Sequence, residues 1–148
     1  MSVPIARMGP SDLVGFELLV RESEKEGYGF LRRMVHEWAS GDLTFSSPGE
    51  CAAIAQEHGC VVGVGGLCRD PYLTADDVGR VRHMYVHPGH RSSGLGVRLL
   101  EFVLSGWKEN FSRVRLRAAN EGSARFYESH GFQAVAGEDN CTHVLISS

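Results

Sequence analysis

The sequence has no long hydrophobic run and few cysteines, and both absences exclude classes of protein. No apolar stretch approaches the ~20 residues that a membrane-spanning helix needs, so we expect no membrane span. The first seven residues lack the apolar segment of a secretory signal. None of the four cysteines forms a Cys-x-x-Cys pair, and no histidine cluster completes a zinc site. We therefore expect a cytoplasmic protein with reduced thiols and no metal centre.

The sequence also lacks a large excess of charge of either sign. The formal net charge is only −3, whereas a dedicated nucleic-acid binder is usually basic, so we expect no nucleic-acid partner. The chain has no repeats, linkers or low-complexity tracts. Its 148 residues are 43% hydrophobic and 22% charged, which is typical of a soluble globular protein. We predict one domain over residues 1–148, long enough to bury a sizeable core.

The most informative stretch runs from Val81 to Leu100. Residues 81–86 are rich in β-branched and aromatic side chains and predict a strand. His87-Pro88-Gly89 breaks that strand, because proline cannot donate to a β-ladder. From about Gly94 the apolar residues recur at helical spacing. The stretch therefore predicts a strand, a turn and a helix in direct succession.

The turn before this helix, Arg91 to Gly96, contains two glycines. A helix start leaves backbone N–H groups free and carries a partial positive charge, so it can cradle a phosphate. The alternative is an ordinary glycine-rich turn that is capped by Ser92 or Ser93. Two other phosphate-binding motifs match weakly. Gly89 to Gly94 has the glycine spacing of a Walker loop but lacks its lysine, and the Gly63–Cys68 segment lacks the third glycine of a dinucleotide fingerprint.

The rest of the chain predicts a mixed α/β fold. We expect the first helix to begin at Ser11 or Asp12. Further helices are predicted over 30–39 and 120–130, and strands over 5–8, 51–56, 60–67, 113–118, 133–135 and 143–146. This order predicts helices packed on a largely antiparallel sheet. Arg113, Arg115 and Arg117 alternate along one strand and predict a solvated face, although they could also bind an acidic ligand.

Two motifs resemble those of one enzyme family. Met-Tyr-Val-x-Pro at 84–88 is followed by Arg-x-x-Gly-x-Gly at 91–96, and Asn120 is followed by Ala124, Phe126-Tyr127 and Gly131-Phe132. Together these segments resemble the acetyl-CoA-binding motifs of the GCN5-related N-acetyltransferases (GNAT). The resemblance implies a mostly antiparallel sheet of about seven strands, flanked by about four helices.

The resemblance also implies the cofactor site. Backbone N–H groups of residues 92–97 would bind the pyrophosphate of acetyl-CoA, and pantetheine would lie along 84–86 beside a bulged, locally unpaired strand. An N–H of Tyr85 or Val86 would polarise the thioester carbonyl. Asn120 would bind pantetheine or simply cap its helix. The residues expected to bind the cofactor are Met84, Tyr85, Val86, Arg91, Ser92, Ser93, Gly94, Leu95, Gly96, Val97, Asn120 and Ser123.

Proton transfer is implied for fewer residues. Tyr127 matches the general acid of the family, because a phenol is fully protonated at neutral pH and can protonate a leaving thiolate. The alternative is a core aromatic residue. The glutamate that many members place before the asparagine is absent, since that strand carries Arg115. His83 is the best substitute for the base, with His143, Glu37 or a water relay as alternatives.

The resemblance implies N-acetylation of a primary amine by direct transfer. Acidic residues in the expected acceptor regions favour a small cationic molecule or a peptide or protein amine. These residues are Glu22, Glu24, Glu26, Glu37, Asp70, Asp76, Asp77, Glu138 and Asp139. One alternative function is a non-catalytic acyl-CoA-binding sensor or partner module, and another is a nucleotide-phosphate-binding module. A homodimer is compatible with the sequence.

Overall fold

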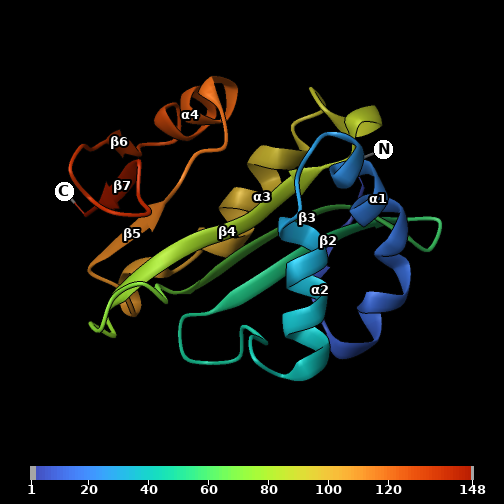
Figure 1. Cartoon of the computed structure of the whole chain (residues 1–148), viewed down its shortest axis with the longest axis horizontal. Helices are drawn as coiled ribbons and strands as arrows, with labels where there is room; N and C mark the ends of the chain where they lie inside the picture. Colours follow the sequence, from blue (N-terminus) through green and yellow to red (C-terminus); the bar gives the residue numbers. More distant parts are fainter. Residues whose placement is uncertain (1–2, 148) are drawn as a thin grey trace.

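A computed structural model describes residues 3–147 of the chain, and its centre is a seven-stranded sheet. The strand order is β1-β2-β3-β4-β5-β7-β6 (Figure 1). β4 and β5 run parallel, whereas the other neighbours are antiparallel. The strands span Ile5–Arg7 (β1), Cys51–Glu57 (β2), Cys60–Arg69 (β3), Val78–Val86 (β4), Arg113–Leu116 (β5), Gln133–Ala134 (β6) and His143–Ile146 (β7). The predicted fold class, a mixed α/β fold on a mostly antiparallel sheet, is confirmed.

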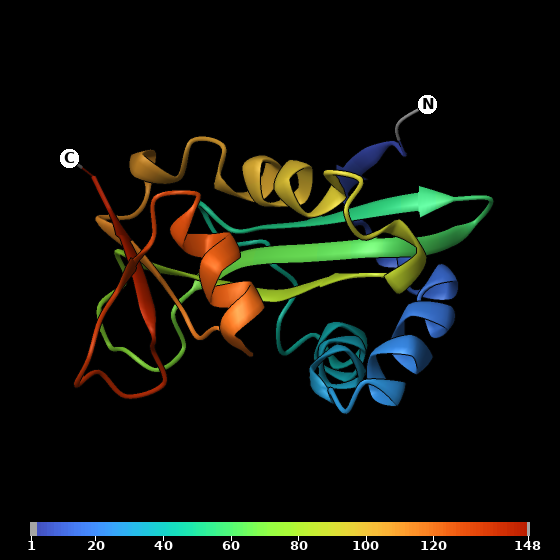
Figure 2. The same ribbon diagram turned by 90° about the horizontal axis from the view of Figure 1, so that it is seen from above.

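Four α-helices flank the sheet. They span Glu17–Lys25 (α1), Phe30–Ser40 (α2), Leu95–Leu104 (α3) and Glu121–Glu128 (α4). α1 and α2 cover one face and α3 the other, as Figure 2 shows. Among residues 3–147, no helix is long and apolar enough to cross a lipid bilayer.

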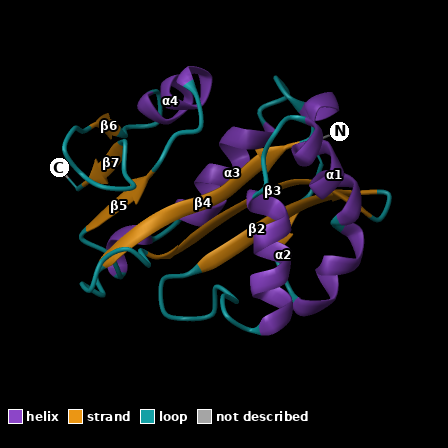
Figure 3. Ribbon diagram, viewed as in Figure 1, coloured by secondary structure: helices purple, strands orange, loops and turns teal. Residues whose placement is uncertain are grey.

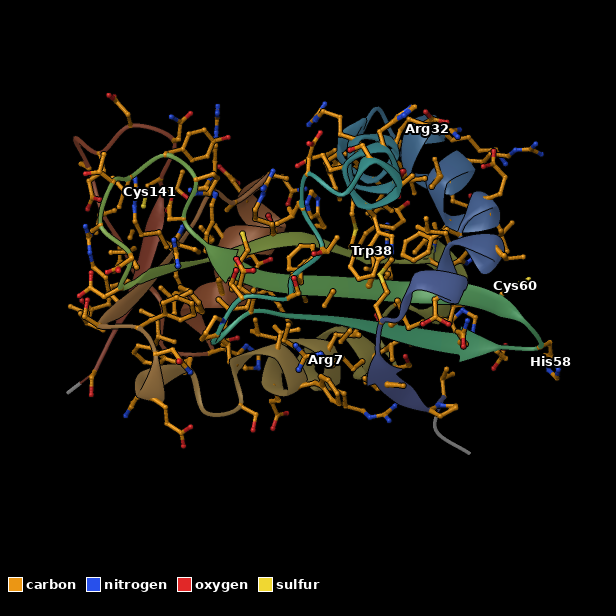
Figure 4. All side chains as sticks on the ribbon, turned by 90° about the horizontal axis from the view of Figure 1, so that it is seen from below. Arg7, Arg32, Trp38, His58, Cys60 and Cys141 are labelled. Carbon is orange, nitrogen blue, oxygen red and sulfur yellow. The ribbon has the colours of Figure 1, made fainter. Side chains whose placement is uncertain are left out.

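Each face of the sheet has its own hydrophobic core. Under α1 and α2, the buried side chains include Leu19, Leu31 and Met34. In Figure 4, Trp38 points from α2 toward the sheet and Arg32 points away, where it pairs with glutamates of α1. On the other face, α3 packs with residues of β5 and α4. Apolar periodicity along each helix thus sets the layer to which it belongs.

The start of the first helix differs from the prediction. Residues 10–15 form a 3₁₀ segment, and α1 begins only at Glu17. Asp12 does act at a helix start, because its carboxylate accepts a hydrogen bond from the Gly9 N–H at 2.6 Å. The other predicted cap, the Ser11 side chain, lies outside the described part of the structure. The 3₁₀ segment ends at Gly15, where an added Cβ would lie 2.7 Å from the Gly59 carbonyl oxygen of the β2–β3 turn.

β4 carries the expected bulge. Tyr85 lies opposite Val64 and Arg82 lies opposite Gly66, so His83 and Met84 together face one residue of β3. His83 takes the left-handed conformation with φ of 61°. β5 pairs only with Val78–Arg80, which leaves the following part of β4 without a partner on that side (Figure 3). The sheet therefore opens at the bulge, and α4 lies beyond this opening.

The predicted solvated arginine face on β5 is wrong for Arg115. Its side chain is only 2% exposed and donates to the Asp70 carboxylate at 3.0 Å and to the Asp139 carbonyl at 2.8 Å. Arg113 is half-buried beside Glu138, and only Arg117 is exposed. The β3–β4 and β6–β7 loops supply the partners of Arg115, so they cover the face that alternation assigned to solvent.

Candidate active site

The N-terminus of α3 has the form of an anion cradle. Gly94 precedes the helix with φ of 82°, and no heavy atom lies within 4 Å of a Cβ added there. Ser93 donates its hydroxyl to the His90 carbonyl, and neither Ser92 nor Ser93 accepts a hydrogen bond from a helix N–H. The alternative of a serine-capped turn is therefore wrong. The first amides of α3 remain available to a ligand.

Three elements meet at this cradle. A Cβ on Gly96 would lie 3.7 Å from the ring of Phe126 and 3.9 Å from the side chain of Val86. The start of α3 is thus packed between α4 and the end of β4. A Cβ at position 96 would make only ordinary contacts, whereas side chains larger than alanine would reach the neighbouring elements.

The unpaired edge of β4 presents backbone groups toward the opening. His87 donates its N–H to the Val62 carbonyl at 2.8 Å, on β3. Because main-chain groups alternate in direction along a strand, Val86 directs its N–H and carbonyl away from β3. The Val86 carbonyl accepts a hydrogen bond from Arg91 Nε at 3.1 Å. Of the two expected donors to a thioester, Val86 rather than Tyr85 therefore directs its N–H away from β3 and toward the opening.

Arg91 is held by the loop between α1 and α2. Its guanidinium donates two hydrogen bonds to the Glu26 carboxylate, at 2.6 and 2.9 Å, and lies over the Tyr85 ring at 5.3 Å. The Tyr85 hydroxyl donates to the same carboxylate. These contacts, that from Arg91 above all, lower the pKa of Glu26 to about 2. Glu26 is therefore ionised, and the guanidinium of Arg91 balances its charge. The sequence did not indicate this pairing.

Asn120 has the capping role that the sequence allowed. Its side-chain oxygen accepts the Ser123 N–H at 2.8 Å, and Ser123 Oγ accepts the Asn120 N–H at 3.1 Å. Asn120 Nδ2 also donates to the Tyr28 hydroxyl at 3.1 Å. The α1–α2 loop thus contacts both predicted cofactor segments, through Glu26 and Tyr28. The sequence placed Tyr28 among the acidic residues of the expected acceptor region but did not predict its contact with Asn120.

Tyr127 is buried against other aromatic residues. It is 7% exposed, and its ring centroid lies 5.2 Å from that of Phe126 and 5.6 Å from that of Phe132. Burial raises the pKa of Tyr127 above its usual value. The phenol therefore carries its proton at neutral pH, as a general acid must.

His83 is buried between two aromatic rings. Its centroid lies 6.3 Å from that of Phe30 and 6.1 Å from that of Phe45, and Nε2 has no hydrogen-bond partner among residues 3–147. Burial, together with the charges of Arg82 and Arg33, lowers the pKa of His83 to about 3. The imidazole is therefore neutral and only a weak base.

The other two candidate bases differ in their surroundings. His143 is buried, with Nε2 at 2.7 Å from a Glu128 oxygen and Nδ1 at 2.8 Å from Thr142 Oγ1. Both ring nitrogens are thus engaged, and the contact with Glu128 joins α4 to β7. Glu37 is half-buried on α2, and its carboxylate makes no hydrogen bond with the described residues. No three His, Cys, Asp or Glu side chains between residues 3 and 147 converge as a metal site.

Comparison with known proteins supports one assignment. Residues 48–134 match the family model described as the acetyltransferase (GNAT) domain. A putative acetyltransferase from Exiguobacterium sp. 255-15 is 32% identical, with a TM-score of 0.83, over 99% of this chain and 94% of that one. A search of curated protein sequences finds no significant match. The chain belongs to the GNAT family of acetyltransferases.

More distant structures share the fold. A GNAT-family acetyltransferase from Staphylococcus aureus Mu50 is 20% identical with a TM-score of 0.71, over 98% of this chain and 99% of that one. The PaiA N-acetyltransferase from Thermoplasma acidophilum, solved in complex with coenzyme A, is 18% identical with a TM-score of 0.67. That match covers 99% of this chain and all of the other. Coenzyme A binding thus occurs on this fold.

Proposed function

We propose that this protein transfers the acetyl group of acetyl-CoA to a primary amine. The observation that carries the proposal is the juxtaposition of an uncapped α3 N-terminus with the open edge of β4. The α3 N-terminus can bind a pyrophosphate, and the open edge of β4 can bind the extended, amide-containing pantetheine arm. Membership of the GNAT family and the coenzyme A complex of PaiA support the same cofactor.

The cofactor contacts follow from this arrangement. The amides of residues 92–97 hold the pyrophosphate, with Gly94 and Gly96 allowing close approach. Main-chain groups of Met84 and Val86 bind the pantetheine arm along β4. Asn120 and Ser123 lie at the start of α4, on the other side of the opening, and Arg91 adds a positive charge. Binding at Arg91 and Asn120 requires adjustment of their contacts with Glu26 and Tyr28.

In the reaction, a bond forms between the acceptor nitrogen and the acetyl carbon while the bond from that carbon to sulfur breaks. The Val86 N–H stabilises negative charge on the carbonyl oxygen. Tyr127 supplies the proton to the leaving thiolate, because burial keeps its phenol protonated. The acceptor must also lose a proton. A water relay suits this step better than His83, whose pKa of about 3 makes it a weak base.

An acceptor screen that follows release of the free coenzyme A thiol tests this function. We expect thiol release that depends on an amine and is accompanied by the N-acetylated product. Acetyl-CoA binding by calorimetry, with no thiol release from any amine, would instead support the acyl-CoA sensor. Absence of acetyl-CoA binding would refute both functions.

A further inference from the structure

Arg82 projects from β4 toward the layer of α1 and α2 without a charged partner. It lies opposite Gly66, and a Cβ on Gly66 would meet the ring of Phe45, so this face of the strand is the α2 face. Arg82 is half-buried, and no carboxylate oxygen of residues 3–147 lies within 4 Å of its guanidinium. Its neighbour is the Cys68 thiol, whose pKa burial raises to about 11. That thiol is neutral and does not balance the charge.

Arg33 brings a second guanidinium to the same region. It lies on α2 one turn after Phe30, the residue whose ring faces His83. Arg33 is exposed, and none of the described carboxylates lies within 4 Å of it. The charges of Arg82 and Arg33 both disfavour protonation of His83. His83 is 8% exposed, and its Nε2 is a buried polar atom without a partner in the described part of the chain.

Most arginines near the opening are paired, unlike these two. Arg91 binds Glu26, Arg113 binds Glu138, and both Arg80 and Arg115 lie against Asp70. Glu26, Asp70 and Glu138 are three of the nine acidic residues that favoured a cationic acceptor, and Glu22 and Glu24 also form ion pairs. Glu37 is unpaired among the described residues and lies on α2 one turn after Arg33, so this region holds one unpaired carboxylate against two unpaired guanidinium groups. The surplus charge next to the proposed acceptor side of β4 is therefore positive.

We propose that the amine acceptor carries an oxyanion, a carboxylate or a phosphate, which Arg82 and Arg33 bind beside His83. This inference rests on the proposed N-acetyltransferase function and names its substrate class. Guanidinium groups form strong, paired hydrogen bonds with both oxyanions. A neutral imidazole can donate one further hydrogen bond. Such an acceptor supplies a direct counter-charge to Arg82 and Arg33, neither of which has a described carboxylate within 4 Å.

The spacing along β4 also limits the acceptor's length. Val86, which faces the acetyl group, and Arg82 are four residues apart, or about 13 Å in a regular strand. The bulge and the arginine side chain shorten this distance only in part. Acceptors whose amine and oxyanion are separated by several bonds therefore fit better than α-amino acids. The expectation from sequence of a cationic acceptor is replaced here by one of opposite charge.

Matched acceptor pairs test the inference. The carboxylate pair is 6-aminohexanoate and hexylamine, the phosphate pair is 3-aminopropyl phosphate and 3-aminopropanol, and 1,6-diaminohexane represents cations. We expect kcat/KM to be at least tenfold higher for the anionic member of one or both pairs, which also identifies the anion. Glycine should be a poorer acceptor than 6-aminohexanoate.

Arg82→Gln and Arg33→Gln should each lower kcat/KM at least tenfold for the preferred anionic acceptor and less than twofold for its neutral match. Arg21→Gln, which removes an exposed arginine of α1, is the control and should change neither. Melting temperatures identify any variant that fails to fold. Because Arg33 is exposed, its variant remains informative if Arg82→Gln is unstable.

Two results would overturn the inference. One is a neutral or cationic amine that matches or exceeds both anionic acceptors. The other is an anion preference that survives both substitutions in folded protein. If no amine is acetylated, the proposed function fails, and calorimetry with 3-aminopropyl phosphate in the presence of coenzyme A decides this inference separately. The same titration is made with 6-aminohexanoate. Binding of either anion that Arg33→Gln weakens at least tenfold supports the anion site, whereas absence of binding for both anions, or binding that the substitution leaves unchanged, refutes it.

Discussion

Asp70 and Arg115 form a buried ion pair, with 3.0 Å between Oδ2 and Nη1, and neither side chain is more than 2% exposed. The same carboxylate oxygen lies 3.5 Å from Arg80 Nη1. Asp70→Asn would leave Arg80 without a carboxylate partner and Arg115 with only Glu138, whose Oε1 lies 3.3 Å from its Nε. We expect a loss of about 3–5 kcal/mol in the free energy of unfolding, measured by urea denaturation. Asp76→Asn, in the exposed part of the same loop, should change it by less than about 0.5 kcal/mol. Equal effects of the two variants would contradict this role of Asp70.

Gly94 tests the anion cradle. Gly94→Glu places a carboxylate where the pyrophosphate should bind, and we expect acetyl-CoA affinity to fall at least tenfold, or about 1.4 kcal/mol. Because Gly94 has φ of 82°, any side chain there also introduces strain. Gly94→Gln has the same size and the same strain without the charge, so it isolates the electrostatic effect. Calorimetry that finds unchanged affinity in folded Gly94→Glu would remove the pyrophosphate from this position.

Tyr127 tests the general acid. Tyr127→Phe keeps the aromatic packing with Phe126 and Phe132 but removes the proton. Loss of a general acid typically slows the reaction by about 10²–10⁴, and we expect kcat to fall within this range. Acetyl-CoA affinity and melting temperature should change little. A kcat within twofold of the parent value would make Tyr127 a core residue only.

His83 should make the protein less stable in acid. Its pKa is about 3 in the folded protein against 6.5 in an exposed chain, so only the unfolded state takes up a proton between these values. Its contribution is complete above pH 6.5 and falls as the pH drops toward 3. By pH 5 this loss amounts to about 2 kcal/mol of unfolding free energy.

Urea denaturation at pH 7.5 and pH 5 measures this effect. His83→Asn should lose less stability on acidification than the parent, because asparagine does not titrate and tolerates a positive φ. His58→Asn is the matched control, since His58 also has a positive φ of 52° but is exposed on the β2–β3 turn. Identical pH dependence in the parent and His83→Asn would show that His83 is not held neutral.

Local sequence signals predicted most of the elements. The β2–β3 hairpin around His58, the helix α2 and the Asn120 cap of α4 all follow from residues close in sequence. Arg115 was misplaced because alternation shows which side chains share a face, but not which loop covers that face. The glycine at position 15 also depends on a distant residue, because a Cβ there would lie 2.7 Å from the carbonyl oxygen of Gly59.

In the candidate site, too, the features set by residues close in sequence were predictable and those set by distant residues were not. The glycine-containing start of α3 and the bulge of β4 lie within one continuous stretch; the sequence indicated the first, and the family resemblance implied the second. The contacts of Glu26 with Arg91 and of Tyr28 with Asn120 join residues 65 and 92 positions apart, respectively. Neither pairing leaves a periodic signal or a motif. The roles of Glu26 and Tyr28 therefore required the tertiary structure.

The double attachment of the α1–α2 loop has a thermodynamic consequence. One short loop contacts Arg91 through Glu26 and Asn120 through Tyr28, on both sides of the opening. A ligand that displaces either contact changes the conformational stability of the loop. The second ligand then binds beside a loop whose free energy differs from that in the free protein. Linkage then requires reciprocity, so each substrate alters the affinity for the other by the same factor. The dissociation constant measured for each substrate then depends on whether the other substrate is bound.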